Sequence, residues 1–548
     1  MVEKLSKASW FQGRRGPVVL VIMDGVGFGK YKEGDAVASA YKPTLDWFMA
    51  NCPNTRLKAH GQAVGLPSDA DMGNSEVGHN AIGSGRVFDQ GAKLVSSAIA
   101  SGKMFEGQAW KDVSGNAQKG GTLHFIGLFS DGNVHSHIDH LKAMMSQAAK
   151  EGVRRIRVHI LLDGRDVGET SALEYVDPFE EFLKSLRDGG CDARIASGGG
   201  RMYITMDRYN ANWPMVERGW RTHVLGEGRQ FASAHEAIET LRQETGAIDQ
   251  DLGAFVIAED GKPVGTIEDG DSVVYFNFRG DRALEITAAF EGGAEFDKFD
   301  RVRVPKVVYA GMMEYDGDLH VPKRFLTAPP SIDRVQGEFL CALGLRTLAV
   351  SETQKYGHVT YFYNGNRSGK IDDRLEEYVE VPSDVIPFEQ RPWMKGAEIT
   401  DVVLAGIESG KYDFIRCNFP NGDMVGHTGV YQAAQLGVEC VDLCLARIRT
   451  AVEKAGGVLV ITADHGNADD MYEHKKDGSV SQEDGHPKVK TAHSLNPVPC
   501  IVYDPEFKGE YSRELRSGLG ISSIAATCIN LLGYEAPADY DPSVIVAG

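Results

Sequence analysis

Short, continuous runs of apolar residues recur along the chain, each followed by a polar cluster and then by a helical pattern. They lie at 18–23, 122–129, 156–162, 272–278, 306–310, 345–350, 412–419, 458–462 and 500–503. Such runs are typical of strands that are buried on both faces, as in parallel sheets. Their alternation with amphipathic stretches such as 433–455 predicts an α/β fold. Because these folds bind ligands outside the carboxyl ends of their strands, the residues after each run are the first candidates for a site.

The chain is too long for a single hydrophobic core. Cores stop growing at roughly 250–300 residues, so the 548 residues here predict two domains. A glycine-rich stretch at 83–91 and a proline-containing stretch at 322–330 are the candidate boundaries, which suggests a middle domain inserted into the first. The segment 473–490 is polar and carries glycines and charges, so we expect an exposed loop there.

The net charge of −19 argues against broad contact with nucleic acid or an anionic membrane, because both need a basic face. The apolar runs are too short to span a membrane, and no secretory leader is recognisable. The eight cysteines include no C-x-x-C pair, which favours free thiols in a reducing compartment. We therefore expect a cytoplasmic protein that binds neither nucleic acid nor membrane, although a local basic cluster could still bind a small anion.

Several of the apolar runs lead into carboxylates or histidines, the usual ligands of divalent transition metals. These residues are Asp24, Asp423, His427, Asp464 and His465, with His493 further along. Carboxylate and imidazole together suit manganese or zinc better than calcium. Two such sets suit a pair of ions that clamp the oxygens of a transferred phosphoryl group. An Asp and a His four residues apart are more often a helix cap beside a surface histidine, so the prediction depends on the whole set.

Ser75 lies in the sequence DMGNSEVGHNAIGSGR at 71–86, whose glycines and asparagines favour an exposed hydroxyl at the start of a helix. The alternative interpretation is that Ser75 caps the helix, with Glu76 in its first turn. No histidine–aspartate pair for a triad is evident nearby. A serine nucleophile at this position would therefore need a metal ion to lower the pKa of its hydroxyl.

Arginines in the middle third of the chain fall at or near the ends of apolar runs. They are Arg165, Arg201, Arg208, Arg279 and Arg282. Guanidinium groups bind carboxylate and phosphate with two parallel hydrogen bonds, so this cluster indicates a site for a small dianion. Any one of these residues taken alone is more often an ordinary surface arginine. His135, in SDGNVHSHIDH, fits a metal ligand, a substrate donor or a loop residue equally well, and Lys355 has no distinguishing neighbours.

Taken together, the segments MGNSEVGHN, SDGNVHSHIDH, LDGRD, DMVGHTG and TADHGN resemble the cofactor-independent phosphoglycerate mutases of the alkaline phosphatase superfamily. The resemblance extends from MDG at 23–25 to TAHS at 491–494, which is nearly the whole chain. The sequence GHNAIGSGR and the loop 473–490 are closer to the plant-like branch. The resemblance implies a phosphatase-like metal-binding domain from 1–89 and 324–548, with a substrate-binding α/β transferase domain, 90–323, inserted into it.

The resemblance also implies roles for the candidate residues. Ser75 would be the nucleophile and would carry the phosphoryl group in an intermediate. One divalent ion would be held by Asp24, Ser75, Asp464 and His465, and the other by Asp423, His427 and His493. The substrate would be bound by His135, Arg165, Asp166, Arg201, Arg208, Arg279, Arg282 and Lys355. Manganese is the expected metal, with cobalt or magnesium as alternatives.

The implied reaction is the interconversion of 3-phosphoglycerate and 2-phosphoglycerate, a step of glycolysis and gluconeogenesis, without 2,3-bisphosphoglycerate. Asp166 is our candidate for the general acid and base, and Lys355 for offsetting the charge of the phosphoryl group. We expect a monomer whose two domains close around the substrate. A metal-dependent phosphomonoesterase or a phosphosugar mutase would use the same metal site. A protein that keeps the fold without catalysis is disfavoured, because Ser75 and every ligand are present.

Overall fold

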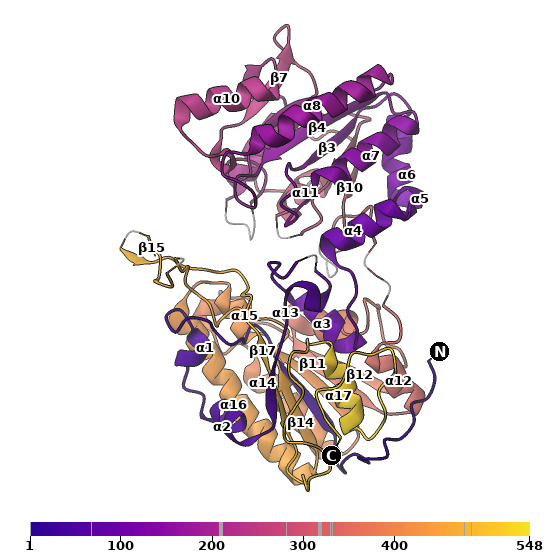
Figure 1. Cartoon of the computed structure of the whole chain (residues 1–548), viewed down its shortest axis with the longest axis vertical. Coiled ribbons are helices and arrows are strands. Elements are labelled where there is room, and N and C mark those ends of the chain that lie inside the picture. Colours follow the sequence, from indigo (N-terminus) through magenta and orange to yellow (C-terminus); the bar gives the residue numbers. More distant parts are fainter. Residues whose placement is uncertain are drawn as a thin grey trace. The chain divides into compact units, whose positions relative to one another are not determined.

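The computed structural model describes residues 2–66, 68–207, 212–280, 282–315, 320–328, 330, 332–475, 477–483 and 485–547. The chain divides into two compact units (Figure 1). Unit 1 comprises Met1–Gln90 and Pro330–Gly548, and unit 2 comprises the intervening Gly91–Pro329. Each unit is built on its own mixed sheet with helices around it, so the predicted α/β class is confirmed.

Unit 1 has a sheet in the order β12-β11-β13-β1-β14-β17-β2. Its strands are β1 (Val18–Met23), β2 (Asn54–Leu57), β11 (Thr347–Glu352), β12 (Glu376–Val381), β13 (Phe414–Phe419), β14 (Val458–Thr462) and β17 (Val498–Tyr503). The five strands from β12 to β14 are parallel, and β17 runs antiparallel to both of its neighbours. Every residue of β1, β11, β13 and β14 is buried, as expected of continuous apolar runs.

The long helix α16 (Tyr431–Ala455) buries one stripe of side chains and exposes the other, which matches the amphipathic pattern of its sequence. It packs against α14 (Gly396–Ser409), which also contacts β11 and β13. The remaining helices of unit 1 are α1 (Ala36–Ser39), α2 (Pro43–Asn51), α3 (Ser75–Ser84), α12 (Gln336–Leu343), α13 (Thr353–Gly357), α15 (Asn421–Gly426) and α17 (Ser523–Leu531). Short 3₁₀ or π turns lie at Gly61–Val64, His358–Phe362 and Phe388–Gln390.

Unit 2 has a sheet in the order β10-β9-β3-β4-β5-β7-β6, with β8 paired to β7. Its strands are β3 (Leu123–Leu128), β4 (Arg155–Leu162), β5 (Asp192–Gly200), β6 (Arg229–Phe231), β7 (Phe255–Glu259), β8 (Lys262–Pro263), β9 (Ser272–Tyr275) and β10 (Val308–Gly311). The strands from β10 to β5 are parallel, and β7 is antiparallel to β5.

Helices cover both faces of this second sheet. They are α4 (Gly91–Ala100), α5 (Lys103–Glu106), α6 (Gln108–Ala117), α7 (Ile138–Lys150), α8 (Ala172–Asp188), α9 (Trp213–His223), α10 (Ala234–Thr245) and α11 (Leu284–Glu291), with a 3₁₀ turn at Asp249–Asp251. Because side chains alternate along a strand, Leu123 and Phe125 of β3 join one apolar cluster, whereas Ile126 and Leu128 join another. Unit 2 therefore has two cores, one on each face of its sheet.

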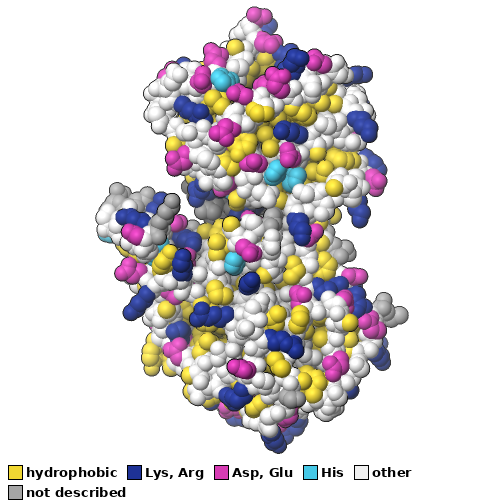
Figure 2. All heavy atoms as spheres, viewed as in Figure 1, with side chains coloured by type: hydrophobic (Ala, Val, Ile, Leu, Met, Phe, Trp, Pro, Cys, Tyr) yellow, Lys and Arg dark blue, Asp and Glu magenta, His cyan; other side chains and the backbone are white. Residues whose placement is uncertain are grey.

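The segment 473–490 contains a small hairpin of β15 (Gln482–Glu483) and β16 (His486–Pro487), and most of its described residues are exposed. Lys and Arg are interspersed with Asp and Glu over the molecular face that Figure 2 shows. Among the residues that the structure describes, no helix is long and apolar enough to cross a membrane.

Candidate active site

Four predicted metal ligands meet at the carboxyl edge of the sheet in unit 1. Asp24 directly follows β1, Asp464 and His465 come just after β14, and Asp423 lies in α15, which begins shortly after β13. Since β13, β1 and β14 are adjacent parallel strands, their carboxyl ends lie side by side. All four side chains are buried.

These residues form two overlapping groups whose ligand atoms all lie within 4.8 Å of one another, one of Asp24, Asp464 and His465 and the other of Asp423, His465 and His493. His427 belongs with the second group, because its Nε2 lies 3.1 Å from Oδ1 of Asp423 and 3.0 Å from Nε2 of His493. The structure thus brings every predicted metal ligand together within unit 1.

Ser75 is the first residue of α3, and its hydroxyl lies at the centre of this cluster. Oγ is 2.9 Å from Nε2 of His465 and 3.2 Å from Oδ1 of Asp24. The alternative that Ser75 caps the helix is wrong, because the side chain of Asn74 accepts the capping hydrogen bond from the backbone of Val77. The hydroxyl is therefore available for another role, although the residue is buried rather than exposed.

Lys355 in α13 provides a positive charge beside the serine. Its Nζ donates to Oγ of Ser75 at 2.5 Å and to Oδ2 of Asp423 at 2.7 Å, and lies 3.2 Å from Oδ2 of Asp24. Burial by itself would lower the pKa of Lys355, but Asp24, Asp423 and Asp464 raise it above its ordinary value. The side chain is consequently an ammonium ion held among carboxylates.

The histidines of the cluster differ in charge. Burial would lower the pKa of His465, but the carboxylates of Asp464, Asp24 and Asp423 raise it to about 10. Burial and the neighbouring charge of His465 lower the pKa of His493 to about 4. Burial opposes ionisation of Asp423, yet Lys355 and His427 hold its pKa well below the usual range. At neutral pH the protons on Lys355 and His465 thus offset part of the charge of the carboxylates.

The donor set fits two divalent cations. Three carboxylates and three imidazoles converge, which is the mixture that manganese and its neighbours prefer. The buried Oδ2 of Asp464 has no hydrogen-bond partner, although Nδ1 of His79 lies 3.3 Å from it and Nε2 of His465 lies 3.8 Å from it. An unpartnered carboxylate oxygen inside a protein is costly unless a cation binds it.

Two residues that the sequence analysis did not single out support this cluster. Nδ2 of Asn418 in β13 donates to Oδ2 of Asp24 at 2.8 Å and lies 3.2 Å from Nε2 of His79. Nδ1 of His79 lies 2.8 Å from the backbone oxygen of Ser75. His79 follows Ser75 by one helical turn, and Asn418 interrupts an apolar strand. Those positions are the available signals, since polar residues on buried strands need partners.

The predicted substrate residues lie in unit 2, with the exception of Lys355. Nη1 of Arg201 donates to Oδ1 of Asp163 at 2.9 Å and pairs with the carboxylate of Asp166. The backbone oxygen of His135 accepts from the N–H of Phe278, the residue before Arg279. These contacts tie the segment after β4 to the loop after β5, and the segment after β3 to that after β9.

Arg282 is buried, and its Nη1 donates to the backbone oxygen of Met206 at 2.5 Å. Arg165 is exposed, and its backbone N–H donates to Oδ1 of Asp163. Arg208 lies outside the described residues, so the prediction for it stays a prediction.

Asp163 belongs to this hydrogen-bonded cluster, although the analysis of the sequence did not single it out. It accepts hydrogen bonds from the backbone N–H groups of Arg165 and Asp166, from the hydroxyl of Ser130 and from Arg201. It is also the first residue after β4. That position, in the sequence LDGRD, is the signal that could have identified it.

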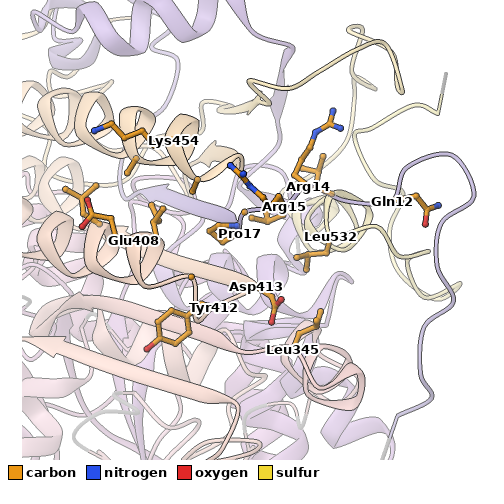
Figure 3. Close-up of a pocket in the computed structure, with 18 of the residues that line it drawn as sticks. Gln12, Arg14, Arg15, Pro17, Leu345, Glu408, Tyr412, Asp413, Lys454 and Leu532 are labelled. Carbon is orange, nitrogen blue, oxygen red and sulfur yellow. The ribbon is translucent and has the colours of Figure 1, made fainter.

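A pocket of about 870 Å³ in unit 1 lies at the amino-terminal ends of the parallel strands, opposite to the candidate ligands (Figure 3). Its lining includes Pro17 and Asp413, which directly precede β1 and β13, and Lys454 near the end of α16. The candidate ligands follow these strands, whereas the residues of this pocket precede them. The pocket is therefore separate from the candidate active site.

The fold and this site together define an α/β metalloenzyme. In agreement, the family model described as the metalloenzyme superfamily matches residues 16–536. The chain is 57% identical over 547 residues to a probable 2,3-bisphosphoglycerate-independent phosphoglycerate mutase of Leptospira interrogans, with 99% of each chain covered. It is 52% identical to the 2,3-bisphosphoglycerate-independent phosphoglycerate mutase of Trypanosoma brucei, with 97% of each chain covered.

A solved structure of phosphoglycerate mutase from Leishmania mexicana, determined at low cobalt concentration, is 50% identical and superposes with a TM-score of 0.72 over the whole of both chains. The chain belongs to the family of 2,3-bisphosphoglycerate-independent phosphoglycerate mutases. The resemblance inferred from the sequence motifs is thus confirmed.

Proposed function

We propose that the protein interconverts 3-phosphoglycerate and 2-phosphoglycerate without 2,3-bisphosphoglycerate, through a phosphoserine on Ser75. The observation that carries the proposal is the position of the Ser75 hydroxyl, which contacts Lys355, His465 and Asp24 within one buried cluster of metal-binding groups. The names of the relatives support phosphoglycerate as the substrate. The arginines of unit 2 support a substrate with two anionic ends.

Two divalent cations would be held by the residues of unit 1. Asp24, Ser75, Asp464 and His465 would bind one, and Asp423, His427 and His493 the other. When bound, such cations supply positive charge that stabilises the charge developing on oxygen during phosphoryl transfer. Manganese is our choice, because carboxylate and imidazole together suit it, and cobalt or magnesium are the alternatives.

The surroundings of Ser75 favour nucleophilic attack by its oxygen on phosphorus. Lys355 donates a hydrogen bond to Oγ and therefore stabilises negative charge on it as the hydroxyl proton leaves. Burial of Ser75 limits the access of water, which would otherwise hydrolyse the phosphoserine to free phosphate. The same ammonium group would stabilise the returning phosphoryl group in the second half of the reaction.

In unit 2, Arg201, Arg279 and Arg282 would bind the carboxylate of the glycerate, with His135, Arg165 and Arg208 completing the set. Asp166 would protonate the departing 3-oxygen and then take the proton from the 2-hydroxyl, which makes one group the acid and the base in turn. Its pairing with Arg201 orients the carboxylate for both steps. We further propose a monomeric cytoplasmic enzyme whose partners are its small-molecule substrates.

The test is to incubate the purified protein with 3-phosphoglycerate, without 2,3-bisphosphoglycerate, before and after chelation and with manganese restored. We expect metal-dependent formation of 2-phosphoglycerate and the loss of both turnover and serine phosphorylation in Ser75→Ala. Release of free phosphate as the main product would instead support a phosphomonoesterase. Turnover by Ser75→Ala would refute the phosphoserine mechanism.

A further inference from the structure

Six buried side chains of unit 2 form one continuous chain of hydrogen bonds across β3, β4 and β5. We call it the crossing chain, and its members in order are Asp271, His124, His159, Ser197, His223 and Thr205. Oδ2 of Asp271 lies 3.1 Å from Nε2 of His124, whose Nδ1 lies 3.0 Å from Nε2 of His159. Nδ1 of His159 lies 2.7 Å from Oγ of Ser197, which is 2.8 Å from Nδ1 of His223. Nε2 of His223 lies 3.0 Å from Oγ1 of Thr205. None of these residues belongs to the proposed reaction.

Strand register explains how the crossing chain forms. His159 of β4 stands opposite Ser197 of β5 on one side and opposite Ile126 of β3 on the other. His124 lies two residues before Ile126 and therefore shares its face of the sheet. His223, the last residue of α9, lies over this face and contacts Ser197. The sheet thus aligns the polar groups in a line inside an otherwise apolar core.

The three histidines are neutral, because burial lowers the pKa of His124 and His159 below the usual range and that of His223 to about 3. Asp271 is ionised: burial opposes its charge, but hydrogen bonds from His124 and from the backbone of Thr122 and Glu268 lower its pKa. One end of the chain is therefore a group that can only accept hydrogen bonds.

This acceptor fixes the direction of every other hydrogen bond in the chain. His124 must donate from Nε2, so its Nδ1 accepts from Nε2–H of His159. Nδ1 of His159 then accepts from the hydroxyl of Ser197, whose oxygen accepts from Nδ1–H of His223. Nε2 of His223 is left as an acceptor, so the hydroxyl of Thr205 must donate to it. Each group is satisfied in this arrangement.

The far end of the chain, Thr205, has an unusual backbone. Its φ is +68°, a left-handed conformation that a β-branched residue adopts only where its surroundings hold it. The residue is fully buried, and its N–H donates to the oxygen of Met215 at 2.9 Å. The lack of a side chain at Gly219 in α9 permits this packing, because a Cβ there would lie 2.0 Å from Oγ1 of Thr205.

Thr205 lies in a loop that contains one of the proposed substrate ligands and accepts a hydrogen bond from another. Arg201 opens this loop, and the oxygen of Met206, the residue after Thr205, accepts the hydrogen bond from Arg282. A change at Thr205 would move that oxygen and alter the path of the backbone from Arg201. Backbone geometry at one residue is thus linked to the position of two guanidinium groups.

We propose that the crossing chain positions Arg201 and Arg282 for substrate binding, with Thr205 as the positioning residue and Asp271 as the group that orders the chain. This inference rests on the proposed function insofar as the two arginines bind 3-phosphoglycerate. The competing interpretation is a satisfied polar network that only stabilises the core of unit 2. It predicts lost stability in variants but unchanged substrate binding.

The first test is independent of activity. Nitrogen NMR of histidine-labelled protein reports which ring nitrogen carries the proton. We expect the proton on Nε2 of His124 and His159 and on Nδ1 of His223, with all three rings neutral from pH 6 to 8. The opposite tautomer at any of these rings, or a protonated ring, would overturn the chain as described, whatever the enzyme's substrate is.

The second test compares Thr205→Val, which keeps the shape but removes the hydroxyl, with Thr205→Ser, which keeps the hydroxyl. We expect Thr205→Val to raise KM for 3-phosphoglycerate about 3- to 10-fold, the equivalent of one lost hydrogen bond, with kcat changed less than about twofold. Thr205→Ser should have the KM of the wild-type protein. Thr287→Val removes another buried hydroxyl of unit 2, one bonded to Tyr309, and serves as the matched control with unchanged KM.

Ser197→Ala breaks the chain at its centre without touching the loop of Arg201. Like Thr205→Val, it should raise KM for 3-phosphoglycerate. The double variant Ser197→Ala with Thr205→Val should have a KM no higher than that of the more strongly affected single variant. Unchanged KM in both single variants, or fully additive effects, would overturn the inference. An absence of turnover in the wild-type protein would refute the proposed function instead, and the NMR test would still decide the order of the chain.

Discussion

Replacement of Lys355 by methionine removes the positive charge that lies closest to the Ser75 hydroxyl and keeps most of the volume of the side chain. Nζ lies 2.7 Å from Oδ2 of Asp423 and 3.2 Å from Oδ2 of Asp24. At an effective dielectric constant of about 20, each attraction is roughly 5–6 kcal/mol. Desolvation of the ammonium offsets part of this, so that removing one member of a buried ion pair costs about 3–5 kcal/mol.

We therefore expect Lys355→Met to lower the free energy of unfolding of the metal-free protein by about 3–5 kcal/mol, measured by urea denaturation. In the metal-loaded enzyme, loss of a donor to the developing charge should lower kcat about 10²–10³-fold. Lys355→Arg keeps the charge and should lose less of both. Lys411→Met is the matched control, since Lys411 forms an exposed ion pair with Glu377 and its loss should change the free energy of unfolding little.

The result that would refute this reasoning is a small change in kcat. A decrease of less than about tenfold, corresponding to 1.4 kcal/mol, would mean that the ammonium does not stabilise the charge on the reacting oxygen. Equal losses of stability in Lys355→Met and Lys411→Met would mean that the buried carboxylates do not depend on Lys355.

Three further predictions concern the metal ligands, the start of α3 and the aspartate after β4. Because the pKa of His465 is raised to about 10 without metal, its contribution to the free energy of unfolding is full below about pH 6.5 and is lost as pH rises through 10. Metal binding should therefore release close to one proton at pH 7.5, measured by calorimetry in buffers of different ionisation enthalpy. The affinity for the metal should rise with pH between 7 and 8.5. Asn74→Ala removes the cap of α3 and should lower the free energy of unfolding by about 1 kcal/mol in urea, with Asn74→Asp close to wild type. Asp163→Asn removes the charge that holds Arg201, so it should raise KM for 3-phosphoglycerate and have a smaller effect on the free energy of unfolding than on the free energy of substrate binding. An unchanged KM would exclude Asp163 from substrate binding.

Much of the fold could be predicted because its central strands are buried on both faces. Val18–Met23 and Val458–Thr462 are continuous apolar runs, and hydrophobic pattern alone identifies such strands. Strand β5 could not be found in this way, since it ends in a serine and three glycines. It is a strand because β4 and β7 hydrogen-bond to its two edges, which is a tertiary effect that local sequence does not contain.

The candidate site shows the same division. Asp24 and Asp464 follow apolar runs, so the general rule for α/β folds locates them. The relation of Asn418 to Asp24, in contrast, depends on the pairing of β13 with β1, which joins residues far apart in sequence. His124 and His159 are visible as polar residues within apolar strands, but only strand register reveals that His159 faces Ser197. Pairing between distant strands is the information that the sequence pattern lacks.

The construction of unit 1 from both ends of the chain has a consequence for its synthesis. In the finished sheet, Val18 pairs with Phe414 on one side and Val458 on the other. At a synthesis rate of about 5–20 residues per second, the apolar strand β1 waits roughly 20–80 s for these partners. All of Gly91–Pro329 emerges in that interval and is continuous in sequence. Unit 2 can therefore fold on the ribosome first, while β1 and the segment that carries Ser75 remain unpaired and open to chaperones.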